Sequence, residues 1–193
     1  MSTKENQLQA ANFLPLGYKV PDKTKQFMKL KQGDNIVRFL SSPLLGSVVF
    51  NEESKPVRKN FYSGEFTSEE LETIKPKKDQ DTGKPDAPKH FWIALVWDSA
   101  EKAPKILEIT QISILKPLYA LVEDNDWGDL RTFDINIHKE GSTKNDTEYT
   151  VTPKPHKPLT KEVQSVVDEL NEKKLLNLDA IWEGEYPFLT YNY

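Results

Sequence analysis

Cysteine is absent from this chain of 193 residues, and so are long hydrophobic runs. Without cysteine the chain has no disulfide and no thiolate metal site. No stretch approaches the roughly 18 consecutive apolar residues that a membrane span requires. The first residues, MSTKENQLQAANF, lack the basic and apolar regions of a signal peptide. We therefore expect no membrane association and a location in a reducing compartment.

Catalytic and cofactor-binding motifs are also missing. The sequence has no Walker loop, no GxSxG nucleophile motif and no GxGxxG dinucleotide motif. Its three histidines, His90, His138 and His156, have no second ligand at a spacing typical of metal sites. Glu108 and Asp134 could face each other as an acid–base pair, or could simply be solvated. The sequence thus predicts a protein that is not an enzyme and has no metal or cofactor.

Acidic residues outnumber basic ones, and the net charge of −4 at first disfavours a nucleic-acid partner. The charges are, however, segregated along the chain. Residues 1–63 contain ten Lys or Arg against five acidic residues, whereas residues 64–193 contain 16 basic and 25 acidic residues. A locally positive groove can therefore exist on a molecule whose total charge is negative.

Alternating apolar and polar residues predict one long strand and two β-hairpins. The long strand follows a Gly33–Asp34 turn and continues through residues 44–50 past a Ser-Pro bend. The hairpins comprise residues 90–98 with 104–111 and residues 131–139 with 147–153. Apolar residues at helical spacing predict a helix between the hairpins. It begins between Ser113 and Lys116, with Pro117 in its first turn.

The order of these elements is three strands, a helix and two strands. A mainly β, five-stranded OB-fold barrel with a helix between strands 3 and 4 has this order, although other α+β sheets have it too. We expect the barrel over residues 27–158, after an extended N-terminal arm over residues 1–26. Residues 63–89 are polar and predict a mobile insertion with a short helix capped by Thr67. A helix capped by Thr160 and an acidic, aromatic tail are expected in residues 159–193.

The strand HFWIALVWD, residues 90–98, is apolar on both faces. The alternate residues expected to face the barrel interior are Phe91, Ile93, Leu95 and Trp97, and those expected outside are His90, Trp92, Ala94, Val96 and Asp98. An outward Trp92 could pack beneath the C-terminal helix or against a second subunit. It could equally stack on the bases of a single strand, as rings do on the strand 2–3 face of OB folds.

Seven stretches of the chain occur in an order that resembles a known family. They are FMKLKQGDNIVRFLSSP, KPVR, KHFWIALVWD, KILEITQ, WGD, FDINIHKEG and YTVTPKPHKPLT. Together they resemble the OB-fold single-stranded DNA-binding proteins of tailed bacteriophages, broadly similar to the T-even type, over about residues 27–183. The chain departs from that type because it has no cysteine for a structural zinc site and no long, densely acidic tail.

The resemblance implies a function and a location. Proteins of this family bind single-stranded DNA without sequence specificity. They coat and protect it during phage DNA replication, recombination and repair, in the cytoplasm of the infected bacterial host. The alternative is an OB-like interaction module that binds a polypeptide through its aromatic face.

Basic residues beside aromatic ones are the candidate DNA ligands, because phosphates attract cations and bases stack on flat rings. The densest such cluster is KPVRKNFY, residues 55–62. The full set of candidates is Arg38, Arg58, Lys59, Phe61, Tyr62, His90, Trp92, Lys105, Arg131 and Lys139. Arg38 could also be an edge arginine paired with an acid. Lys105 is expected to flank Trp92 across the first hairpin.

The C-terminal stretch EGEYPFLTYNY, residues 183–193, has three alternative roles. It could dock on phage replication or recombination proteins, compete with DNA for the basic groove, or pack as the end of the fold. Self-association on DNA is a further expectation from the resemblance.

Overall fold

An open, antiparallel sheet of seven strands is the main feature of the computed structural model, which describes residues 22–143 and 146–189. The strands are β1 (Gly33–Phe39), β2 (Leu44–Phe50), β3 (Pro56–Asn60), β4 (Lys89–Asp98), β5 (Ala103–Ile109), β6 (Phe133–Glu140) and β7 (Glu148–His156). The described α-helices are α1 (Ser68–Ile74), α2 (Ile112–Glu123) and α3 (Lys161–Glu172). Short 3₁₀ segments are η1 (Lys23–Gln26), η2 (Phe61–Ser63), η3 (Leu130–Thr132) and η4 (Leu178–Glu183). The fold is therefore mainly β, as predicted.

The strand order is β3-β2-β4-β1-β6-β7, and β5 pairs with the other edge of β4. β2 and β1 follow one another along one edge of β4, where Leu44 faces Ile93 and Phe39 faces Val96. This arrangement confirms the long strand that bends at the Ser-Pro sequence. Both predicted hairpins are present, as β4–β5 and β6–β7.

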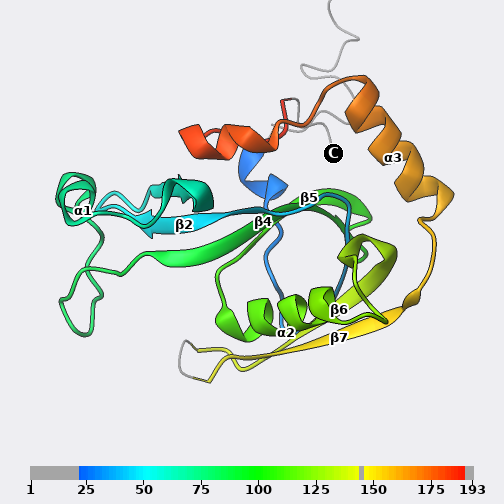
Figure 1. Ribbon diagram of the computed structural model, residues 1–193, viewed down its shortest axis with the longest axis horizontal. Helices are drawn as coiled ribbons and strands as arrows, with labels where there is room; N and C mark the ends of the chain where they lie inside the picture. The colour runs from blue at the N-terminus through cyan, green and yellow to red at the C-terminus, as the bar shows by residue number, and fades with distance from the viewer. Residues whose placement is uncertain (1–21, 144–145, 190–193) are drawn as a thin grey trace, which may run out of the picture.

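The predicted closed barrel is not confirmed, because the sheet is open. Within the described residues no ladder joins β5 to β7. The outer edge of β5 is instead taken by the segment that follows η1, where the backbone N–H of Met28 donates to the carbonyl of Ile106 over 2.8 Å. α2 packs against β7. Figure 1 shows α2 between β4 and β7.

β4 is buried on both faces, and the predicted inner and outer rows are reversed. Ala94 and Val96 belong to the core that contains α2 and the apolar residues of β6, with Trp92 packed at its border. Phe91, Ile93 and Leu95 belong to a second core formed with α3, η4 and Phe188. The assignment was wrong because both rows are apolar, so alternation alone could not distinguish them.

Two of the three described α-helices begin directly after their predicted N-cap residues. Thr67 and Glu70 form the predicted capping box of α1, and the Thr160 hydroxyl caps α3. α2 begins earlier than predicted, at Ile112, so that Pro117 lies beyond its first turn. Proline removes one helical hydrogen bond there. Burial of one face of α2, through Ile114, Leu115 and Leu118, offsets this loss.

The C-terminal segment packs across the sheet on the side opposite α2 (Figure 1). The buried side chain of Gln26 accepts a hydrogen bond from the backbone N–H of Phe188 and donates one to its carbonyl. Phe188 also forms a β-bridge with Leu176. Of the three roles considered for the tail, packing is the one that residues up to 189 adopt; residues 190–193 lie outside the described part, as does most of the predicted N-terminal arm.

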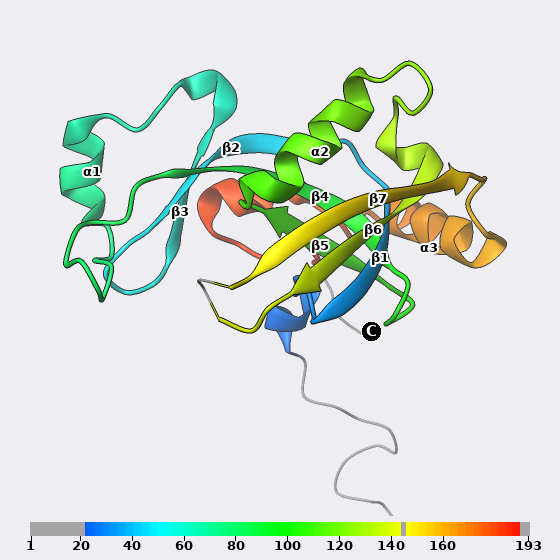
Figure 2. The ribbon, with the colours of Figure 1, turned by 90° about the horizontal axis from the view of Figure 1, so that it is seen from below.

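The β2–β3 hairpin projects from the rest of the sheet with α1 at its outer end (Figure 2). The chain after α1 lies beside β2, where the backbone N–H of Lys77 donates to the carbonyl of Phe50 over 2.8 Å. The mobility expected of residues 63–89 stays a prediction. None of the helices in the described ranges is both long and apolar enough to cross a membrane.

Candidate nucleic-acid interface

Three predicted ligands form an exposed ring cluster at the base of the projecting hairpin. The Phe61 ring lies 5.5 Å from the Tyr62 ring and 6.4 Å from the His90 ring, both edge-on. Phe61 is 56% exposed and Tyr62 is 90% exposed. His90 and Trp92 are two residues apart on β4 and therefore lie on the same face of the sheet. The structure thus places these four predicted residues on one surface.

An apolar groove of about 560 Å³ lies beside Trp92. Its apolar lining is Phe39, Pro43, Leu45, Trp92, Tyr119, Val122 and Leu130. Sequence reasoning missed Tyr119 and Val122, which α2 contributes from its exposed side. The sequence did contain one signal for this groove, an aromatic residue on the exposed side of an amphipathic helix, and that residue is Tyr119. The groove extends the exposed rings past Trp92 toward α2.

Arg131, another predicted ligand, lies at the border of this groove and forms a two-pronged ion pair with Asp129. Its Nη2 is 2.7 Å from the carboxylate. This hydrogen bond lowers the pKa of Asp129 and raises that of Arg131. Both side chains are about half exposed, so the guanidinium remains accessible to a ligand.

Lys59 lies on the ring-bearing face, because Ser47 of β2 faces both Lys59 and His90. Its Nζ is 2.7 and 2.9 Å from the two carboxylate oxygens of Glu70 in α1. This contact is the main reason that the pKa of Glu70 is lowered. A carboxylate therefore occupies the position where a phosphate would bind Lys59.

Arg58 and Arg38 are engaged in ion pairs away from the exposed rings. Arg58 lies on the other face of the hairpin and contacts Glu108 over 2.7 Å. Nε of Arg38 lies 2.8 Å from Asp134, and both guanidinium groups are almost fully buried. Removing one partner of such a buried pair destabilises a fold strongly. Arg38 therefore matches the alternative interpretation, in which it is paired with an acidic residue.

Lys105 does not flank Trp92, and that prediction was wrong. Across the hairpin Trp92 faces Ile109, whereas Lys105 faces Val96. The Lys105 ammonium is buried and donates to the carbonyl of Lys25 over 2.7 Å. The error followed from the hairpin register, which alternation does not fix. The remaining predicted ligand, Lys139, is half-buried opposite Gly33, at the end of β6 farther from η3, where Arg131 lies.

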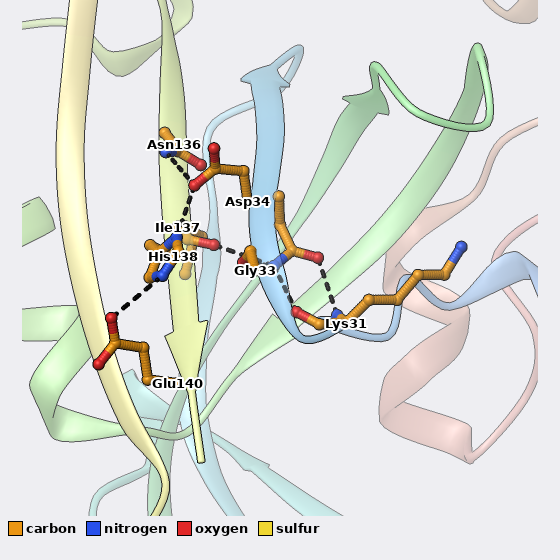
Figure 3. A network of polar contacts seen from close by, with 8 residues as sticks. Lys31, Gly33, Asp34, Asn136, Ile137, His138 and Glu140 are labelled. Atoms are coloured by element: carbon orange, nitrogen blue, oxygen red, sulfur yellow. Dashed lines mark hydrogen bonds and ion pairs between the residues drawn. The ribbon is translucent and has the colours of Figure 1, made fainter. Parts of the chain in front are cut away.

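A polar network joins β1 to β6 through Asp34 and His138 (Figure 3). Nδ1 of His138 lies 2.6 Å from Asp34, and Nε2 lies 3.4 Å from Glu140. The hydrogen bond to Asp34 is the largest cause of the raised pKa of His138. The buried Asn35 amide nearby donates to the carbonyls of Lys31, Gly33 and Ile137. This network fixes the turn before β1 against β6.

The described residues were also compared with the metal-ligand and acid–base arrangements considered from the sequence. Within residues 22–143 and 146–189, no three His, Asp or Glu side chains are grouped as a metal ion would require. Glu108 and Asp134, considered as an acid–base pair, are instead paired separately with Arg58 and Arg38.

Comparison with known protein families, with curated proteins and with solved structures gave no match.

Proposed function

We propose that the protein binds single-stranded DNA without sequence specificity. The observation that carries this proposal is the series of accessible rings along one face, formed by Tyr62, Phe61, His90, Trp92 and Tyr119. Such a series accommodates unpaired bases of any sequence, because every base has a face that stacks on a ring. Double-stranded DNA, whose bases are already stacked, cannot use it.

The connectivity of the sheet supports an OB-fold origin for this surface. With β2 as the continuation of β1, the remaining order is β5-β4-β1-β6-β7, and α2 lies between β5 and β6 in the chain. An OB barrel opened between its third and fifth strands has this order, with the helix in this place. His90 and Trp92 then lie on its second strand, β4, whereas Phe61 and Tyr62 lie on η2 after the projecting hairpin and Tyr119 lies on α2. A role in phage DNA replication, recombination and repair, implied by the family resemblance, is part of the proposal.

The basic residues available to phosphates are fewer than the sequence suggested. Lys59 and Arg131 are on the ring-bearing surface, and each is already paired with a carboxylate. We therefore expect rings to contribute more to affinity than cations do. The salt dependence should be shallow, since each phosphate contact adds about 0.7 to the log–log slope for a single strand.

Fluorescence anisotropy with a labelled thymidine oligonucleotide tests the function. The wild-type protein should bind, and Tyr62→Ala and Phe61→Ala should bind more weakly. The control is Phe50→Ala, because Phe50 is also a partly exposed ring but lies on the opposite face of β2 from Ser47. No binding by the wild-type protein in dilute buffer would refute the proposal.

A second candidate function is the binding of a polypeptide in the groove beside Trp92. The almost wholly apolar lining of the groove favours it, since peptide-binding grooves take apolar anchors. This candidate would be established if the wild-type protein bound no oligonucleotide but selected an apolar peptide from a peptide library. The Trp92→Ala variant should then lose peptide binding.

A further inference from the structure

Arg131 borders two pockets. One is the apolar groove beside Trp92. The other, of about 420 Å³, is lined by Arg38, Arg131, Thr132, His156, Lys157, Pro158 and Leu159. The two pockets therefore adjoin at the Arg131 side chain, with Trp92 lining one of them and Lys157 lining the other.

The basic pocket has a fixed frame. Asp134 contacts both Arg38, over 2.8 Å, and Nζ of Lys157, over 2.5 Å. Nη1 of Arg38 donates to the carbonyl of Lys157 over 3.1 Å. Buried Arg38 thus positions Lys157 through its backbone, while the Lys157 side chain remains 55% exposed.

His156 forms the wall of this pocket and is itself held in place. Its ring stacks on Trp127 with centroids 5.5 Å apart. Nδ1 lies 2.9 Å from the Thr132 hydroxyl, and Nε2 lies 3.0 Å from the carbonyl of Asp126. A pocket with such a frame needs little reordering when a ligand enters, which favours binding.

The charge at this junction is positive. Arg38, Arg131 and Lys157 contribute three positive charges, and their partners Asp129 and Asp134 contribute two negative ones, which leaves +1. Phosphate is the anion that fits beside an apolar, ring-lined groove, because a nucleotide joins a flat apolar base to a phosphate. Lys157 and Arg131 are the exposed cations that can reach it.

We propose that the two pockets together form a binding site for one nucleotide of a single strand. The base enters the groove and stacks on Trp92, the backbone crosses Arg131, and the adjacent phosphate contacts Lys157. This inference rests on the proposed function and adds to it a defined position and the direction in which the strand leaves the rings. Arg38 is a positioning residue in this site and does not contact the phosphate.

The variant Lys157→Gln tests the phosphate contact, with Lys173→Gln as its control. Lys173 is a comparably exposed lysine, also in an ion pair, at the far end of α3. Affinity for a labelled thymidine oligonucleotide is measured over a series of salt concentrations. Lys157→Gln should weaken binding and make the log–log slope shallower by about 0.7, the share of one phosphate. Lys173→Gln should match the wild-type protein.

The variant Trp92→Ala tests the base contact. Loss of one stacked base should weaken binding by about 5- to 150-fold without a change in slope. Thermal unfolding of each variant shows whether it is folded at the assay temperature. If Trp92→Ala does not fold, Trp92→Leu takes its place, because leucine retains apolar volume but offers no ring.

A nuclear magnetic resonance titration of the wild-type protein with the same oligonucleotide needs no variant. The Trp92 indole and the Arg131 and Lys157 amide signals should shift together, with one saturation curve. Wild-type slope and affinity in Lys157→Gln, or shifts at Trp92 without shifts at Arg131 and Lys157, would overturn the composite site while leaving DNA binding intact. A wild-type protein that binds no oligonucleotide would refute the proposed function as well.

Discussion

The two faces of β4 are both largely apolar in sequence but differ in what covers them. On one face, Phe91, Ile93 and Leu95 lie beneath α3, η4 and Phe188. On the other face, α2 covers Ala94 and Val96 but leaves Trp92 at the border of a groove and His90 exposed. The coverage ends where the ring-bearing surface begins.

This difference separates stability from binding along a single strand. Residues beneath the C-terminal segment remove apolar surface from water, which is the main stabilising contribution in a fold of this size. On the other face, the part of β4 that α2 does not cover leaves rings accessible to solvent, so less apolar surface is buried there. Such exposed apolar surface on a folded protein usually indicates a binding site.

The largest expected effect comes from removing part of the cover over Phe91, Ile93 and Leu95, the closed face of β4. Phe188→Ala removes a ring that is 3% exposed and should lower the free energy of unfolding by about 3–5 kcal/mol. Urea denaturation followed by circular dichroism measures this loss. Leu189→Ala, at a neighbouring side chain that is 62% exposed, should change stability by less than about 0.5 kcal/mol. Equal effects of the two variants would show that the C-terminal segment does not cover the sheet.

The next effect concerns the ring-bearing surface formed by Tyr62, Phe61 and the open face of β4, on which His90 and Trp92 lie. Tyr62→Ala should weaken oligonucleotide binding by about 5- to 150-fold, the share of one stacked base, and leave the unfolding free energy nearly unchanged. Anisotropy titration and urea denaturation of the same sample measure both quantities. Phe188→Ala, assayed where it is folded, should show the reverse pattern. Loss of stability in Tyr62→Ala would remove the contrast between the faces.

A smaller, opposite effect should follow from freeing Lys59. Glu70→Gln removes the carboxylate charge beside the ammonium but leaves a side chain that can still complete the capping box of α1. Affinity for the oligonucleotide should rise up to about fivefold, because an ion pair that is only partly shielded from solvent contributes on the order of 1 kcal/mol. Glu72→Gln on the same helix is the control, and weaker binding by Glu70→Gln would argue against a phosphate at Lys59.

The smallest effect lies away from both faces, at the network between β1 and β6. The pKa of His138 is raised by Asp34, so its stabilisation is complete at pH values below the ordinary value near 6.5. That stabilisation is lost as pH rises through the raised pKa. The melting temperature of the wild-type protein should therefore fall more than that of His138→Gln between about pH 6 and about pH 9, a window that begins near the ordinary pKa of histidine and extends above it. Identical profiles would contradict a charged His138–Asp34 pair.

Local features of the fold were predictable from the sequence. Strand alternation predicted both hairpins, and Thr67 and Thr160 predicted two helix starts, because these signals depend on residues a few positions apart. The start of α2 was not predictable in this way, because its N-cap residue, Gln111, makes no side-chain cap and tertiary packing holds the helix past Pro117.

The candidate site was predicted only in part. Phe61 and Tyr62 were predicted because they follow Arg58 and Lys59, and His90 and Trp92 because alternation places them on one face of a strand. The structure brings these four rings onto one surface. The pairing of Arg38 with Asp134 and of Arg58 with Glu108 joins residues 96 and 50 positions apart. No local pattern specifies such partners, so these cations appeared available when they are engaged. The groove likewise depends on α2 lying beside β4, which is a property of the fold.

The most direct test of the open face is the fluorescence of Trp92 alone. The chain has four tryptophans, and replacing Trp97, Trp127 and Trp182 by Phe leaves Trp92 as the sole reporter. Titration with a thymidine oligonucleotide in low salt should quench this emission and saturate, because bases stack on the ring. Unchanged Trp92 emission while the oligonucleotide binds would show that the strand lies elsewhere and would contradict the account.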